Sequence, residues 1–144
     1  MKKIMFLLIL FPTIFCSGCK KEDLTDTTNI TEFSWKLKSI KIKGNKSKVE
    51  EDNYFNDKAY ILVFENDSIF KLNTSVNLAY GHFEIINVGI INISNYNEST
   101  EVGGKNEIDD KLLQNIPLIT SYQVLSNYLF FKGNDIKIEF EKEK

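Results

Sequence analysis

Apolar and polar residues alternate along much of the chain, and this alternation predicts β-strands. The first alternating segment has Trp35 and Leu37 on one face. Ile40 and Ile42 continue the alternation, but their positions are shifted by one residue. Because the side chains of a strand point to opposite faces with a period of two, the shift predicts a β-bulge or bend near Ser39.

Short turn sequences separate the alternating segments in the middle of the chain. Asn66 and Asp67 are typical of a hairpin turn, and they join two strongly apolar segments. The strands predicted in this region are 59–65, 68–73, 79–86 and 89–94. The charged segment 46–58 and the polar segment 95–106 are predicted to be exposed loops.

One segment has the spacing of an amphipathic helix. Asn106 is a favourable N-cap, acidic residues occupy the first turn, and Pro117 ends the helix. The apolar stripe of this helix consists of Ile108, Leu112, Leu113 and Ile116. Three strands then close the chain, at 118–125, 128–131 and 135–141, with hairpin turns at 126–127 and 132–134.

The N-terminus has the pattern of a secretory signal peptide. Lys2 and Lys3 precede an apolar run at 4–15. The run is too short to span a bilayer, because a membrane-spanning helix needs about 20 apolar residues. Small residues follow it, so residues 1–18 are predicted to be a signal peptide.

The end of the apolar run resembles the lipobox of bacterial lipoproteins. Ser17 and Gly18 precede Cys19, although Cys16 stands where the family usually has Leu. The resemblance implies that Cys19 takes a diacylglycerol and becomes the acylated first residue after cleavage, whereas Cys16 leaves with the signal peptide. The mature chain would then have no free thiol, disulfide or cysteine metal site, and the membrane would be its partner through the lipid on Cys19. The alternative is an ordinary signal peptide with an incidental cysteine.

The segment 19–32 is predicted to be a flexible tether, because it is polar and rich in Thr, Asp and Asn. Lys20, Lys21 and the acidic residues after them resemble an export signal of lipoproteins from Bacteroidota, and a plain solvated linker is the alternative. We expect a lipid-anchored protein of the cell envelope at the outer membrane, facing either the periplasm or the cell surface.

Composition disfavours nucleic-acid binding and catalysis. The formal net charge is −2, the chain has no Arg, and no basic patch stands out in the sequence. His82 is the single histidine and lies opposite the apolar face of its predicted strand, which is typical of a surface residue. Glu50, Glu51 and Asp52 could clasp calcium, but adjacent acids in a loop are more commonly just solvated. We therefore predict no catalytic residue, no metal and no cofactor.

The order of the predicted elements resembles the META/HslJ-like domain, a small β-rich fold of bacterial envelope lipoproteins. Trp35 and Leu37 match the opening Trp-x-Leu of that family. Asn77 and Gly81 match its Asn and the Gly that follows, and Thr100 matches the Thr of its Ser/Thr loop. The family's Cys before the Asn is replaced by Val76.

This resemblance covers residues 33–140 and implies the fold of a domain at 33–144. The implied fold is β-rich α+β, with one antiparallel sheet or open barrel of about eight strands and one helix packed on it. We expect Trp35 to be buried between the sheet and the helix, and the Asn77 amide to hold the turn 77–81. The family has no established catalytic activity, and its name hints at a stress role.

The leading functional hypothesis is therefore a membrane-anchored, non-catalytic binding or interaction module with an envelope protein or a glycan as its partner. Aromatic side chains either serve such binding or pack in the core, and the candidates are Tyr54, Phe55, Tyr80, Tyr96 and Tyr128. The alternative is a lipocalin-like carrier of a small apolar ligand, which needs a hollow barrel. Lipocalins open with Gly-x-Trp, and Phe33 stands in the place of that Gly.

Overall fold

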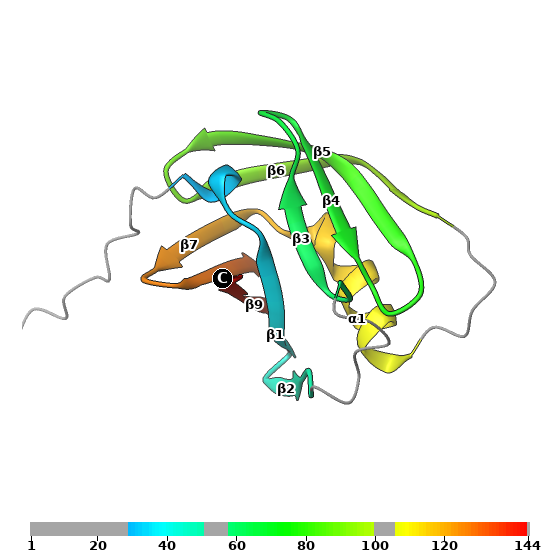
Figure 1. The fold of residues 1–144 in the computed structure, drawn as a ribbon. Coiled ribbons are helices and arrows are strands. Elements are labelled where there is room, and N and C mark those ends of the chain that lie inside the picture. The colour runs from blue at the N-terminus through cyan, green and yellow to red at the C-terminus, as the bar shows by residue number, and fades with distance from the viewer. Residues whose placement is uncertain (1–28, 51–57, 100–105, 144) are drawn as a thin grey trace, which may run out of the picture.

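A computed structural model describes residues 29–50, 58–99 and 106–143. Its nine antiparallel strands form one sheet in the order β2-β1-β3-β4-β5-β6-β7-β8-β9 (Figure 1). The strands are β1 (Trp35–Ile42), β2 (Asn45–Lys48), β3 (Ile61–Phe64), β4 (Ile69–Asn73), β5 (Leu78–Asn87), β6 (Ile90–Glu98), β7 (Ser121–Leu125), β8 (Tyr128–Gly133) and β9 (Ile136–Lys142). An additional pairing of β1 with β9 closes the sheet into an eight-stranded barrel, with β2 as an extra strand on β1. The predicted β-rich fold with one α-helix is confirmed, and the barrel is closed.

Strand β1 closes the barrel because it pairs with β3 on one side and with the last strand, β9, on the other. Its start pairs with β3, where Trp35 lies opposite Leu62, and it pairs with β9 along its length. The β1–β9 register shifts between Leu37 and Ser39, which confirms the predicted bulge. The shift lets Leu37 and Ile40 both point into the core although three positions separate them.

The seam where β6 pairs with β7 is much shorter than the pairing between β1 and β9. One residue pair joins these strands, Ile90 with Ser121. Two flanking backbone bonds extend it, from Ile91 N to Thr120 O at 3.2 Å and from Tyr122 N to Gly89 O at 2.9 Å. The barrel is therefore least well paired at this seam among its described strand contacts.

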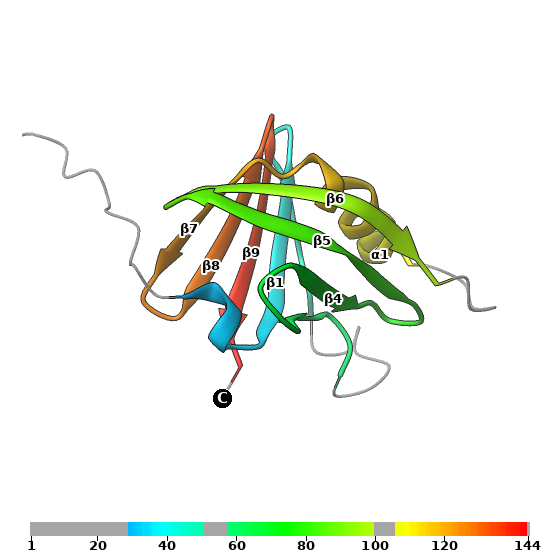
Figure 2. The same ribbon diagram turned by 90° about the horizontal axis from the view of Figure 1, so that it is seen from above.

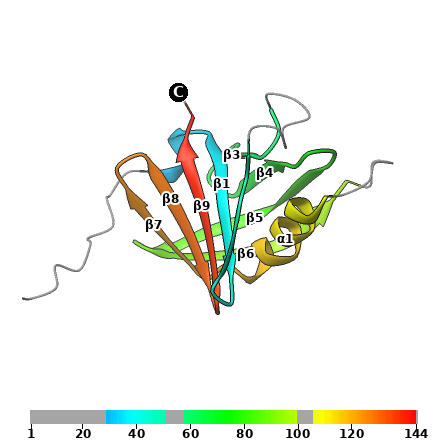
Figure 3. The same cartoon turned by 90° about the horizontal axis from the view of Figure 1, so that it is seen from below.

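Helical segments lie on opposite sides of the barrel (Figures 2 and 3). The 3₁₀ helix η1 (Ile30–Glu32) precedes β1, whereas α1 (Glu107–Asn115) and the short η3 (Ile116–Leu118) lie between β6 and β7. The Asn106 side chain accepts a hydrogen bond from Asp109 N at 2.9 Å, which confirms the predicted N-cap. The apolar stripe of the helix faces the core, with Leu112, Leu113 and Ile116 buried and Ile108 partly buried.

Bulky side chains fill the barrel interior. An eight-stranded barrel is just wide enough for its own side chains to fill, or to hold one small ligand. Here the largest fully buried side chains are Trp35, Tyr60, Phe70, Phe131, Phe140, Ile30, Leu37, Ile40, Leu62, Leu72, Ile91 and Leu112. Edge-to-face aromatic pairs add to this packing, such as Phe64 with Phe83 at 4.8 Å between ring centroids.

Trp35 is buried as expected, but the element that covers it is η1. Its indole Nε1 donates a hydrogen bond to Ile30 O at 2.8 Å, and its ring meets the Phe33 ring edge-to-face at 6.1 Å. Ile30 itself is buried, so residues 30–32, which the sequence analysis placed in the tether, belong to the packed structure. Asn29 starts this turn, because its side chain accepts a hydrogen bond from Thr31 N.

Two predicted loops are partly strand. The short β2 lies inside the segment 46–58 and pairs with β1, and β6 continues to Glu98 inside the segment 95–106. Both are stabilised by pairing with the preceding strand rather than by their own apolar pattern. The remainder of these predicted loops, 51–57 and 100–105, lies outside the described residues.

Candidate functional site

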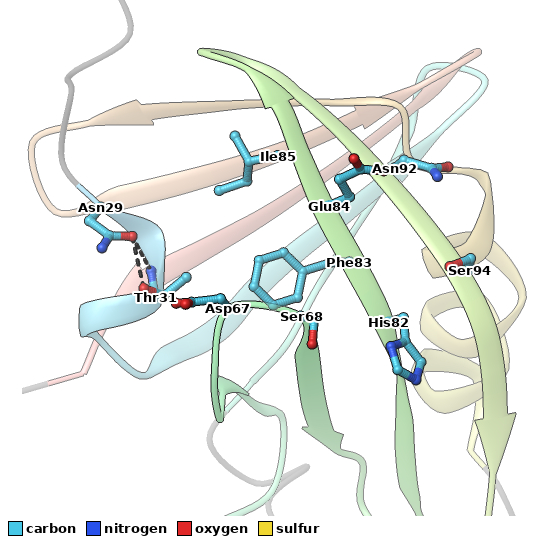
Figure 4. Close-up of a pocket in the computed structure, with 10 residues that line it drawn as sticks. All are labelled: Asn29, Thr31, Asp67, Ser68, His82, Phe83, Glu84, Ile85, Asn92 and Ser94. Carbon is cyan, nitrogen blue, oxygen red and sulfur yellow. Dashed lines mark hydrogen bonds between the residues drawn. The ribbon is translucent and has the colours of Figure 1, made fainter.

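An open groove with a volume of about 530 Å³ lies beside η1, where the β3–β4 turn meets β5 and β6 (Figure 4). Most of its lining side chains are polar. The lining consists of Asn29, Thr31, Asp67, Ser68, His82, Phe83, Glu84, Ile85, Asn92 and Ser94. These residues come from four separate elements, so the folded barrel is needed to assemble the groove.

The turn between β3 and β4 places one wall of the groove. Asn66 Oδ1 accepts hydrogen bonds from Ser68 N at 2.9 Å and from Ile69 N at 2.9 Å. This side-chain-to-backbone bonding is what makes Asn favourable in turns, and it confirms the hairpin predicted at Asn66-Asp67. Ser68 O then accepts from Phe83 N at 2.8 Å, which fastens the turn to β5.

Strand alternation divides the β5 side chains between two faces. Phe83 is buried and points towards η1 and the β3–β4 turn, whereas His82 points the other way (Figure 4). His82 is exposed, as expected of a surface residue, and it contributes to the groove from the outer face of β5.

The groove offers amide, hydroxyl, carboxylate and imidazole groups in an open, solvated setting. Such groups can donate and accept hydrogen bonds to a polar ligand. Among the residues that the structure describes, no group of three His, Cys, Asp or Glu side chains is arranged to hold a metal ion. Of the acidic loop considered for calcium, Glu50 is described and exposed, whereas residues 51–57 are outside the described part of the chain.

The residues of the META/HslJ-like motif do not gather at the groove. Trp35 and Leu37 are buried on β1 at the core. Gly81 lies on β5, where a Cβ would stand 2.9 Å from Phe70 Cε1, so the glycine allows the Phe70 ring to approach the strand. Cys19 and Thr100 lie outside the described residues.

Asn77 is buried in the turn between β4 and β5, and Thr74 organises that turn. The Thr74 hydroxyl accepts hydrogen bonds from Asn77 N at 2.9 Å and from Val76 N at 3.4 Å. It also donates to Asn77 O at 3.1 Å, and Thr74 N donates to the same carbonyl at 2.8 Å. These bonds use the backbone of Asn77, and the expected role of its side-chain amide stays a prediction.

A buried polar cluster joins α1 to the barrel on the side opposite η1. Asn106 Nδ2 donates to the Tyr60 hydroxyl at 2.8 Å. Asp109 is fully buried, accepts a hydrogen bond from Ser75 N at 3.2 Å, and accepts another from the Ser75 hydroxyl. Burial raises the pKa of the Tyr60 hydroxyl to about 12, although the bond from Asn106 acts in the opposite direction. The sequence analysis assigned Asp109 only to the first helical turn, and no local signal indicated its partner Ser75.

The strand register aligns four lysines across the outside of the barrel. Lys46 lies opposite Lys41, Lys41 lies opposite Lys137, and Lys137 lies opposite Lys132. We refer to these four residues as the lysine row. They are scattered along the sequence, and the strand register brings together lysines that the sequence analysis did not group.

Glu139 provides a negative charge beside the lysine row. Its Oε2 accepts hydrogen bonds from Ser39 Oγ at 2.9 Å and from Lys46 Nζ at 3.2 Å. Burial raises the pKa of Glu139, but these hydrogen bonds and the charges of Lys46 and Lys137 outweigh burial and hold the pKa below its usual range.

The candidate aromatic residues fall into two groups. Tyr80 and Tyr128 are exposed, and Tyr128 stacks on Phe130 at 6.3 Å between centroids. Tyr96 packs against the core, and its hydroxyl is buried with no hydrogen-bond partner among the described residues. Burial, together with the charge of Glu98, raises the pKa of Tyr96. Tyr54 and Phe55 lie outside the described residues.

Comparisons with known proteins support the fold but do not indicate an activity. No protein-family model and no curated protein matches the chain. A crystal structure of a DUF4847 family protein from Bacteroides vulgatus ATCC 8482 is similar, with a TM-score of 0.58 and 14% sequence identity. The match covers 79% of this chain and 94% of that protein. No helix in the described part of the chain is long and apolar enough to cross a membrane. The chain therefore shares its barrel architecture with a DUF4847 protein, and the META/HslJ resemblance stays a prediction.

Proposed function

We propose that the chain is a lipid-anchored, non-catalytic binding module of the bacterial cell envelope. The observation that carries this proposal is the position of Cys19. It follows two small residues at the end of an apolar run and lies ten positions before Asn29, the first described residue. Acyl chains on Cys19 would hold the barrel close to a membrane surface.

The groove beside η1 is the proposed binding surface. Its support is the polar lining drawn from η1, the β3–β4 turn, β5 and β6, together with a barrel interior occupied by bulky side chains. A ligand rich in hydroxyl or amide groups, such as a glycan or a polar loop of an envelope protein, matches this lining chemically.

Mass spectrometry tests the anchor. Wild-type protein extracted from membranes should carry the mass of the acyl chains on a chain that starts at Cys19. Cys19→Ser should accumulate as an unmodified precursor, whereas the matched control Cys16→Ser should be processed and acylated like the wild type. Unacylated wild-type protein in the membrane fraction would contradict the proposal.

Site-specific photo-crosslinking in intact cells tests the groove. A photoreactive residue at His82 or Ser94, which line the groove, should give discrete adducts with an envelope component. The same residue at Asn134, which is exposed in the turn between β8 and β9, serves as the matched control. Equal labelling from all three positions would argue against a specific site at the groove.

A lipocalin-like carrier is the second candidate, and the closed eight-stranded barrel is the observation that favours it. A ligand inside would have to displace side chains such as Phe70 and Phe131, which are almost completely buried. Titration with a fluorescent fatty acid separates the two functions. Saturable one-to-one binding would favour the carrier, and its absence would favour the surface module.

A further inference from the structure

The hairpin formed by β5 and β6 ends in an exposed aliphatic tip. Ile85, Ile86, Val88 and Ile90 are 38%, 55%, 66% and 45% exposed, and we refer to these four residues as the hairpin tip. No charged residue occurs from Ile85 to Asn97. A cluster of exposed aliphatic side chains of this kind usually marks an interaction site.

The hairpin tip extends beyond β4 on one side, while Ile90 pairs with Ser121 of β7 on the other. The last β4 residue paired with β5 is Ile69, which lies opposite His82. The residues of the hairpin tip therefore come after the part of β5 that the barrel covers on this side. Gly89 makes the reversal of the hairpin with a φ of 84°, a conformation that favours glycine.

The aliphatic side chains occupy both faces of the hairpin. Ile85 lies opposite the buried Ile91 and therefore shares its inner face, whereas Ile90 directly precedes Ile91 in β6 and points to the outer face. A protein partner that docks on one face would leave the side chains of the other face in water. An apolar medium that surrounds the hairpin tip would cover all four, and the acyl-chain boundary of a bilayer is such a medium.

The point at which the anchored segment enters the fold lies on the same side of the molecule. Asn29 at the start of η1 and Ile85 of the hairpin tip line the same groove (Figure 4). Asn29 lies ten positions after Cys19, and a fully extended chain of ten residues spans at most roughly 33–36 Å. A lipid on Cys19 would therefore keep this side of the barrel within reach of the bilayer.

We propose that the hairpin tip inserts into the membrane interface and orients the barrel on the bilayer to which Cys19 anchors it. The proposal rests on the proposed function, because the tether brings the hairpin tip to the membrane. The hairpin tip acts as a second, reversible contact beside the permanent lipid anchor, in the way that stable anchoring commonly combines two signals. The β8–β9 turn, on the far side of the molecule from η1 in Figures 2 and 3, is then expected to stay outside the bilayer.

Fluorescent labelling of the purified mature lipoprotein tests this orientation. Acylation of Cys19 leaves no native thiol, so an introduced cysteine can be labelled alone with an environment-sensitive nitrobenzoxadiazole dye. The test site is Asn87→Cys within the hairpin, and the matched control is Asn134→Cys in the β8–β9 turn; both residues are exposed. Each labelled protein is reconstituted into vesicles of phosphatidylethanolamine and phosphatidylglycerol.

The label at position 87 should shift its emission to the blue and lose quenching by aqueous iodide when vesicles are present, whereas the label at position 134 should do neither. Replacing Ile86 and Val88 together by Ser should abolish the blue shift at position 87, which excludes an effect of the dye itself. Both replaced side chains are exposed, so the barrel should still fold.

Three results would overturn the insertion. The label at position 87 could remain as iodide-accessible as the control, it could shift to the blue without vesicles because a second copy covers it, or the Ser variant could keep the shift. Mass spectrometry of the same samples separates the two proposals. Acylated protein with an accessible hairpin refutes insertion alone, whereas unacylated protein refutes the anchor and removes the basis of the insertion with it.

Discussion

Tyr60 is one of the residues that join α1 to the barrel. Its side chain is fully buried, its backbone has a φ of 62°, and its hydroxyl bonds to the N-cap residue Asn106. The left-handed backbone region is unfavourable for a bulky side chain. Packing and hydrogen bonding at this position therefore outweigh the local preference of the backbone.

Tyr60→Phe should reduce the decrease in the free energy of unfolding that occurs at alkaline pH. The pKa of Tyr60 is about 12 in the folded protein, above the value of 10.0 for an unperturbed tyrosine. A group whose pKa is raised by folding contributes stability that is complete below pH 10 and is lost as the pH rises towards 12. The wild type should lose roughly 1–3 kcal/mol more than the variant over this window, as measured by urea unfolding at each pH. Parallel pH profiles for the two proteins would show that Tyr60 ionises as freely when folded as when unfolded.

At the scale of elements, the signals that predicted structure correctly are local ones. The Asn66 turn, the Asn106 cap and the bulge beside Leu37 each depend on residues adjacent in sequence, and the structure has all three. The strand β2 was missed because its polar residues are ordered by pairing with β1. A strand defined by its partner carries little signal of its own.

The turn between β4 and β5 shows the same limit at a candidate motif. The sequence indicated Asn77 as its organiser, and the role of the Asn77 amide stays a prediction. The structure adds the hydroxyl of Thr74, which bonds to the backbone of Asn77 in both directions. The alternation of apolar residues placed the turn. Its hydrogen-bond donors could not be assigned without coordinates, because Thr, Ser and Asn in this segment are all suitable turn residues.

Thr74→Val should destabilise the protein more than Thr74→Ser. Val keeps the shape of Thr but removes the hydroxyl, which leaves Asn77 N without that acceptor in a buried turn. The expected cost is about 1–3 kcal/mol in the free energy of unfolding, measured by chemical denaturation. Ser retains the hydroxyl and should lose less. If the two variants are equally stable, the methyl group rather than the hydroxyl is the important part of Thr74.

At the scale of the whole molecule, the barrel distributes its charge unevenly although the net charge is only −2. The lysine row crosses β2, β1, β9 and β8 on the outside of the barrel. Neither composition nor periodicity could reveal it, because the row exists only when strands from the two ends of the chain pair in one register. Like charges directly opposite one another on neighbouring strands are destabilising.

Lys41→Glu should therefore stabilise the protein. Lys41 has a lysine opposite it on both sides, and an acidic residue would replace two repulsions by two attractions. The expected gain is about 0.2–1 kcal/mol for each pair at low salt, and added salt should reduce it by screening. Lys41→Gln is the matched control and should show part of the gain. Denaturation at low and high ionic strength measures both, and an unchanged stability of Lys41→Glu at both ionic strengths would mean that repulsion in the row is already fully screened.

The pairing of β1 with β9 also determines when the barrel can close during folding. The Ser39–Glu139 contact joins residues 100 positions apart, whereas β3 to β6 pair only with their neighbours in sequence or with β1 and β7. Contacts with such separation form slowly, because the entropy of closing a long loop is lost before they are made. The first strand must therefore wait for the last one to be synthesised. Until then β1 presents an unpaired edge, which is the region of the nascent chain most in need of protection from aggregation.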